Sequence, residues 1–131
     1  QFLLWVLLFS YLAVAVSFAL KASLSAFGIS RSLAWHVFTY CSTGLFTIGM
    51  MGRVILGHTG RNILEPPSAV VWIFGLIVVG SIVRVFLPLL DSTHYVFWIG
   101  LSQLFWVSAF ALFLLAFMPM LLQPRADGQP G

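Results

Sequence analysis

Four long apolar runs, separated by short polar stretches, constrain this sequence more than any other feature. A helix needs roughly 20 apolar residues to cross the hydrocarbon core of a bilayer, and the runs 1–20, 33–57, 69–87 and 95–122 are close to or above that length. Hydrophobic residues make up 61% of the chain and charged residues only 7%, so charge cannot cover a water-facing surface. The sequence therefore predicts an all-α, polytopic integral membrane protein with four transmembrane helices in a lipid bilayer.

Charged residues and prolines mark the ends of the predicted spans. Lys21 closes the first span, the stretch 65–68 precedes the third, and Pro88 is expected to stop it. Pro124 follows the fourth span, which leaves 123–131 as a polar tail. Proline is tolerated at a helix start and just beyond a helix end, where its missing N–H matters least. Because the connections are short, we expect one transmembrane domain in which consecutive helices are antiparallel neighbours.

The distribution of basic residues does not orient these four spans. Four crossings place the loops 21–32 and 91–94 on one side of the membrane, and the loop 58–68 with the tail on the other. Each side has three basic residues near it, so the positive-inside rule favours neither. They are Lys21, Arg31 and Arg84 on the first side, and Arg53, Arg61 and Arg125 on the second.

The sequence also indicates what the chain is part of and what it does not do. It opens with Gln1 directly into an apolar run, so we expect the C-terminal part of a longer chain whose N-terminal helices are its partners. Cys41 is the only cysteine, which excludes an internal disulfide or a thiolate metal cluster. The basic residues form no patch, which argues against nucleic-acid binding. No carboxylate pair, serine elbow, phosphate loop or HExxH motif predicts a conventional enzyme.

The second apolar run contains the most ionisable groups, namely His36, Arg53, His58 and, just beyond it, Arg61. Ionisable residues inside a membrane span indicate function by default. His36 and His58 are 22 positions apart, which is roughly 33 Å along an unbroken helix. They cannot ligate one metal ion unless the glycines break the helix, so two centres near opposite membrane faces are predicted.

Weaker ligand candidates lie near each of these histidines in membrane depth. His94 shares the side of His36, and Asp91 could orient an imidazole there. Met118 and Met120 share the side of His58, and an imidazole with thioethers would suit Cu(I). His36 as an interhelical hydrogen-bonding residue and His94 as a loop residue remain open alternatives.

Glycines accompany the arginines of the second span. Gly49, Arg53 and Gly57 share one helix face, and with Gly52 they leave room for a close partner such as a flat porphyrin. Arg53 or Arg61 could then pair with a propionate, and Arg84 repeats the pattern with Gly80 one turn before it. Helix–helix packing is the alternative role for these small residues.

Two further features have structural interpretations. His58 and Arg61 lie where cations favour a helix C-terminus, with Gly60 as a left-handed cap. The aromatic stripe that begins at Trp106 in the fourth span predicts a lipid-facing or packing surface.

The second span resembles the NnrS family of haem- and copper-containing membrane proteins. The resemblance rests on Ala34-Trp35-His36 followed one helix later by Gly57-His58-Thr59-Gly60-Arg61, and on the tail from Pro124 to Gly131. It implies a multi-pass protein of the bacterial inner membrane that binds haem and copper. Such a protein acts in the response to nitric oxide and the relief of nitrosative stress, with nitric oxide as a ligand.

The resemblance also implies roles for particular residues. His36 and His58 become the leading haem or metal ligands, and Arg53, Arg61 and Arg84 become contacts for a propionate or an anion. Two other functions fit the residues: a cofactor-free transporter or channel for a small anion, and a cytochrome-b-like electron-transfer subunit that pairs His36 with His94. An oligomer is compatible with each of the three.

Overall fold

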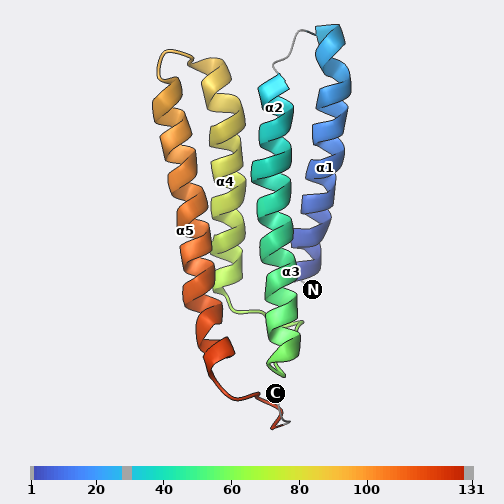
Figure 1. Cartoon of the computed structure of the whole chain (residues 1–131), viewed down its shortest axis with the longest axis vertical. Helices are drawn as coiled ribbons and strands as arrows, with labels where there is room; N and C mark the ends of the chain where they lie inside the picture. The colour runs from blue at the N-terminus through green and yellow to red at the C-terminus, as the bar shows by residue number, and fades with distance from the viewer. Residues whose placement is uncertain (1, 28–30, 129–131) are drawn as a thin grey trace.

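The computed structural model describes residues 2–27 and 31–128, which are all helix, turn or loop without a strand. It confirms the all-helical prediction (Figure 1). In chain order the elements are α1 (Phe2–Phe27), α2 (Arg31–His36), the π-helical segment η1 (Val37–Ser42), α3 (Thr43–His58), α4 (Ala69–Leu90) and α5 (Tyr95–Leu122). The elements α2, η1 and α3 follow one another without a break and make the second rod of the bundle.

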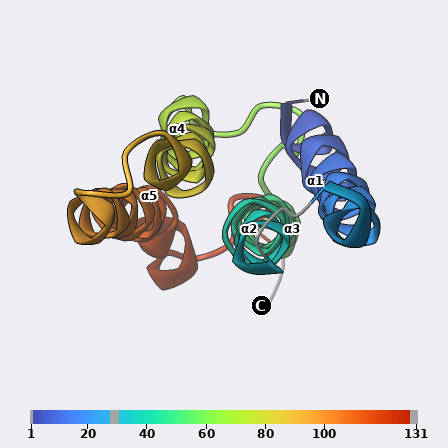
Figure 2. The ribbon, with the colours of Figure 1, turned by 90° about the horizontal axis from the view of Figure 1, so that it is seen from above.

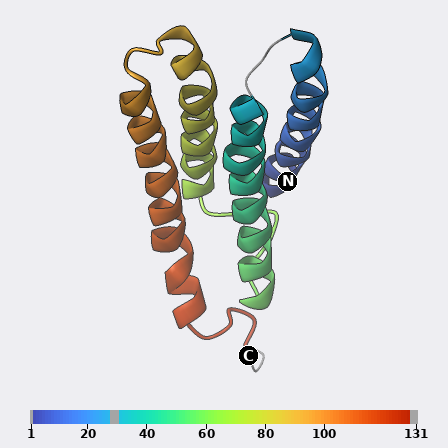
Figure 3. The same ribbon diagram turned by 45° about the horizontal axis from the view of Figure 1, so that its top comes forward.

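The four rods run alternately up and down, as the short connections predict (Figure 1). Seen from above, the α2–α3 rod lies between α1 on one side and the α4–α5 pair on the other (Figure 2). The two halves meet where α3 packs on α5 and η1 packs on α4. At the lower end, the tail after α5 turns toward the end of α3 (Figure 3).

Three of the described helices, rather than the expected four, are long and apolar enough to cross a membrane by themselves: α1, α4 and α5. The second rod does not qualify because the π segment divides it, and α3, its longest α-helical piece, has only 16 residues. Large apolar side chains cover the outside of the bundle, including Leu90 (82% exposed), Val96 (81%) and Trp72 (73%). An apolar exterior of this kind is suited to lipid and not to water.

A continuous apolar core runs along the inside of the bundle. The fully buried side chains come from all four rods and include Leu3, Val6, Leu45, Ile48, Leu56, Ile73, Ile77, Phe113 and Phe117. One polar contact reinforces the packing: the hydroxyl of Ser10 donates to the Ser42 carbonyl at 3.0 Å, and the hydroxyl of Ser42 donates to the Ser10 carbonyl at 3.1 Å. This reciprocal pair joins α1 to η1 inside the apolar interior.

Two helix ends differ from the predicted span ends. Helix α4 passes through Pro88 and ends at Leu90, where the Asp91 N–H still donates to the Leu87 carbonyl at 2.9 Å. A proline in the last turn removes one hydrogen bond without preventing the final residues from staying helical. Helix α1 likewise continues past Lys21, whose ammonium lies 4.8 Å from the centre of the Trp35 ring. The lysine is accommodated by a cation–π contact with the neighbouring rod.

Candidate functional site

A cavity of about 320 Å³ that is lined by several polar side chains lies between the second rod and the α4–α5 pair. It is located toward the end of the bundle that contains the α4–α5 loop. Its lining residues are His36, Thr39, Tyr40, Arg84, Gln103, Trp106 and Val107. Among the described residues, this is where a predicted ligand histidine and a predicted anion-contacting arginine come together. We therefore take it as the candidate site.

The π-helical segment forms one wall of the cavity. His36 is the last residue of α2, and the wider turns of η1 begin directly after it, so that Thr39 and Tyr40 follow His36 along the wall. Segments of π-helix are rare and are frequently found at functional sites. The local backbone therefore distinguishes His36 from His58, which is exposed at the end of α3.

Tyr40 ties the site together by crossing from η1 to α5. Its hydroxyl donates to the backbone carbonyl of Ser102, and on the way the side chain passes over Gly80 of α4. A Cβ atom built on Gly80 would clash with the Tyr40 hydroxyl and would lie 2.9 Å from the Cβ of Phe105. Gly80 is thus required for a close approach, and the partner that approaches it is a tyrosine of the same chain.

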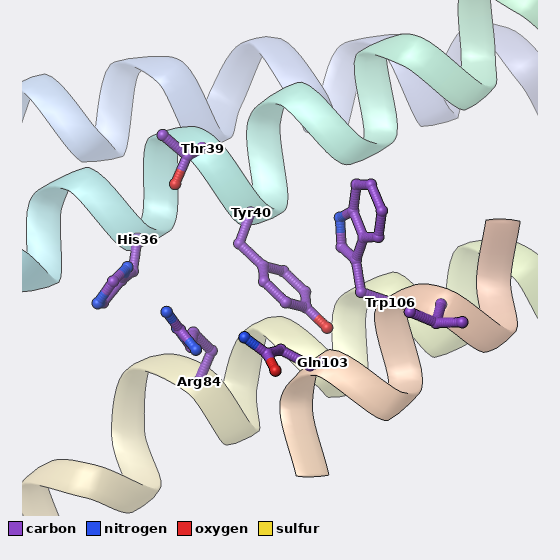
Figure 4. Close-up of a pocket in the computed structure, with 7 residues that line it drawn as sticks. His36, Thr39, Tyr40, Arg84, Gln103 and Trp106 are labelled. Carbon is purple, nitrogen blue, oxygen red and sulfur yellow. The ribbon is translucent and has the colours of Figure 1, made fainter. Parts of the chain in front are cut away.

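Arg84 lies one turn beyond Gly80 and supplies the positive charge of the site. Figure 4 shows its guanidinium between the imidazole of His36 and the amide of Gln103. Its Nε and Nη1 atoms are buried and have no hydrogen-bond partner among the described residues. The guanidinium also acts electrostatically on His36. Buried polar atoms are normally satisfied, so this guanidinium is suited to a ligand.

His94 has a different partner from the one that the sequence suggested. Its Nδ1 lies 2.8 Å from the Asp91 carboxylate, which also accepts a hydrogen bond from the Trp98 indole at 3.3 Å. The hydrogen bond from His94 lowers the pKa of Asp91 below its ordinary value. Asp91 does orient an imidazole, but the cavity that contains His36 is not lined by His94.

The opposite end of the bundle shows that Arg61 has a structural role. The Arg61 guanidinium donates to the Met120 carbonyl at 3.4 Å and to the Gln123 side-chain oxygen at 3.0 Å. Its backbone N–H donates to the Leu56 carbonyl at 2.9 Å, while Gly60 has a φ of +68°. These features form a Schellman cap, so the predicted role of Gly60 is confirmed.

The tail packs against this cap. The Ala126 N–H donates to the Thr59 carbonyl at 3.0 Å, and a Cβ on Gly60 would lie 2.6 Å from the carboxyl carbon of Asp127. The Gly-His-Thr-Gly-Arg string therefore ends α3 and docks the tail.

The copper candidates at this end lie near the end of α3 and the end of α5. His58 and Met118 are exposed, and Met120 is half-buried beside the core. Within residues 2–27 and 31–128, no three His, Cys, Asp or Glu side chains are grouped so that they could hold a metal ion.

Neighbouring side chains occupy the space beside two glycines of the second rod, Gly49 and Gly52. A Cβ at Gly49 would lie 2.9 Å from Leu7 of α1, and one at Gly52 would lie 3.4 Å from Phe117 of α5. Gly57 is exposed and faces Ile63 at 3.6 Å. At Gly49 and Gly52 the structure therefore shows helix packing. Arg53, between them and Gly57, is half-buried and does not line the cavity.

Sequence reasoning missed four residues that line the cavity: Thr39, Tyr40, Gln103 and Val107. Trp106 packs against Phe110, as its stripe suggested, and also lines the cavity. Gln103 carried a usable signal, because an uncharged amide in the middle of an apolar span needs a polar partner. Tyr40 carried none, since tyrosines are common in membrane helices.

Comparison with known proteins identifies the family. A family model described as NnrS protein matches residues 1–125, which is nearly the whole chain. The chain therefore belongs to the NnrS family. No curated protein and no solved structure matches it.

Proposed function

We propose that this chain forms part of a haem-binding membrane protein of NnrS type that acts in the response to nitric oxide and relieves nitrosative stress. Family membership over residues 1–125 is the observation that carries the proposal. The second rod, residues 31–58, would be the fourth span beside α1, α4 and α5. The bacterial inner membrane, with further helices of a longer chain packed around it, is the proposed setting.

The residues of the cavity match a haem group in kind. His36 would offer an imidazole to the haem iron, and the Arg84 guanidinium would offer its partnerless donors to a propionate. Arg–carboxylate pairs are among the strongest hydrogen-bonded contacts in proteins. A bound haem supplies an iron centre that coordinates nitric oxide. The chain's own contribution would be to hold that centre through His36 and to pair its carboxylate through Arg84.

The copper prediction rests on family resemblance and on the ligand types alone. Among the described residues no group of three His, Cys, Asp or Glu side chains could hold a metal ion. A copper site that uses His58 and the thioethers of Met118 and Met120 stays a prediction, and no step is derived from it.

An optical spectrum of the purified protein in lipid nanodiscs tests the haem proposal. After loading with haem, we expect a Soret band that shifts when nitric oxide is added to the reduced protein. His36→Ala should abolish the native spectrum, and added imidazole should restore it, whereas His58→Ala and His94→Ala should keep it. A protein that takes up no haem, or one whose spectrum depends on His58 and not on His36, would refute the assignment.

The unsatisfied guanidinium of Arg84 favours one second candidate, a cofactor-free carrier or channel for a small anion. Flux of radiolabelled nitrite into proteoliposomes, lost on Arg84→Gln in a protein that takes up no haem, would place this function ahead. The same flux measured with His36→Ala separates the two functions, since only the haem function requires an imidazole.

A further inference from the structure

We infer that Arg84 binds a carboxylate or another small planar oxyanion that comes from outside the described part of this chain. The inference deepens the proposed function, since it assigns the anionic group of the ligand to one arginine of the three that the sequence offered. It stands on charge and burial at the cavity and holds for a cofactor or for a free anion.

An acidic side chain of the same chain could neutralise Arg84. The sequence contains three acidic residues, and the structure describes all of them. Asp91 is paired with His94 in the loop after α4, and Asp127 is paired with Arg125 through two hydrogen bonds of 2.9 Å and 2.6 Å. Glu65 lies in the loop between α3 and α4, at the opposite end of the bundle from the cavity (Figure 1). None of these three acidic side chains lines the cavity that contains Arg84.

Arg84 differs from Arg61 in its hydrogen-bond partners. The Arg61 guanidinium reaches a backbone carbonyl and a side-chain oxygen at a helix end, where it also meets solvent. The Nε and Nη1 atoms of Arg84 are buried and lack a partner among the described residues. Together they carry three N–H donors. A long cationic side chain near a membrane face usually extends to the interface, but that of Arg84 points into the cavity instead (Figure 4).

Other polar side chains line the cavity beside Arg84. Beside the guanidinium are the imidazole of His36 and the amide of Gln103, and the amide N–H groups can donate a further hydrogen bond to an oxygen atom. The Tyr40 hydroxyl is already used on the Ser102 carbonyl. A planar group with two oxygens matches the guanidinium fork better than a bare halide does. The cavity of about 320 Å³ admits such a group together with part of a larger molecule.

The test observes Arg84 directly in the intact protein. The protein is labelled with ¹⁵N at arginine Nε, placed in nanodiscs, and the Nε–H signals are recorded. The Arg84 signal is assigned by its disappearance in Arg84→Lys. Three probes are titrated separately: metal-free protoporphyrin IX, its dimethyl ester, and sodium nitrate. Because the porphyrin contains no iron, its binding does not depend on whether His36 ligates haem.

We expect the Arg84 signal to move with the free-acid porphyrin or with nitrate, and not with the ester. Arg84→Gln should weaken binding of the responsive probe by about 10- to 100-fold, as expected for lost charge-assisted hydrogen bonds. Arg125→Gln removes the same charge at the other end of the bundle and should leave the Kd unchanged. Response to the porphyrin acid alone identifies a cofactor carboxylate as the source, and response to nitrate alone identifies a free oxyanion.

The inference is overturned if no probe moves the Arg84 signal, or if the ester binds as tightly as the acid while nitrate has no effect. Both results come from the wild-type protein, so a variant that fails to fold does not obscure them. Failure of the haem proposal looks different: the protein would take up no haem, or His36→Ala would leave the haem spectrum intact, whatever Arg84 binds.

Discussion

The crossing of Tyr40 over Gly80 predicts a large effect from one added methyl group. In Gly80→Ala the new Cβ would clash with the Tyr40 hydroxyl and lie 2.9 Å from the Cβ of Phe105. The phenylalanine Cβ is fixed to the α5 backbone, so Tyr40 must move and its hydrogen bond to Ser102 is lost. Overpacking of about 1–3 kcal/mol and a hydrogen bond of about 1 kcal/mol together predict a loss of about 2–4 kcal/mol.

A double-mutant cycle isolates the contact between these two residues. Tyr40→Phe alone should cost about 0.6–1.7 kcal/mol, the range for hydrogen bonds between membrane helices. In the Gly80→Ala background the same change removes the clashing hydroxyl and should be neutral or stabilising. The ring carbon Cζ would still lie 3.1 Å from the new Cβ, so relief is partial. A coupling of about 1–2 kcal/mol is expected, since contacting residues are not additive.

Reversible unfolding in mixed micelles, followed by far-UV circular dichroism, provides the free energies. Gly75→Ala is the matched control, because it lies on the same helix and a Cβ there meets no atom within 4 Å. We expect it to be neutral or slightly stabilising, as alanine favours the helix. The reasoning is refuted if Gly80→Ala is as stable as Gly75→Ala, or if the coupling falls below about 0.5 kcal/mol.

Three further predictions concern the ends and the interior of the bundle. Gly60→Ala should lose about 1–2 kcal/mol to its left-handed backbone and should also release the tail, which would be cut faster by a protease. Gly128 has a similar φ of +71° but open space around it. Gly128→Ala should therefore lose stability through backbone strain without releasing the tail. In a ¹³C NMR titration, Asp91 should have a pKa below its ordinary value, and His94→Ala should raise that pKa. The stabilisation from this pair is present above the ordinary aspartate pKa and is lost as pH falls through the lower folded value. Ser42→Ala should reduce the unfolding free energy by about 0.6 kcal/mol, and by no more than about 1.7, in the same micelle assay.

The helices and their order could be predicted because hydropathy and loop length report them directly. The predicted fourth span covers the same residues as α5, Tyr95–Leu122, and the αL cap at Gly60 followed from its position after α3. The π segment could not be predicted, because no residue type in Val37–Ser42 requires it. It divides the second rod, which leaves α3 too short to count as a span by itself.

Membrane depth could be inferred from the sequence, but the direction of each side chain around its helix could not. His36 and His94 share a side of the membrane, and on that basis a meeting was a reasonable hypothesis. Asp91 is only three residues from His94, so a local hydrogen bond forms between them at little entropic cost. Arg84, also at this depth, is the residue that faces His36 across the cavity.

The face of α4 explains why Arg84 meets His36. Gly80 and Arg84 are four residues apart and therefore lie on one helix face. Tyr40 packs on this face at Gly80, and Arg84 extends from the same face toward His36. The same spacing had suggested an empty groove for a flat cofactor along both residues. Tyr40 and Phe105 instead fill the space at Gly80. Any ligand of Arg84 must consequently enter from the side of His36 and Gln103, and a porphyrin could place only its carboxylate edge, not its face, against this part of α4.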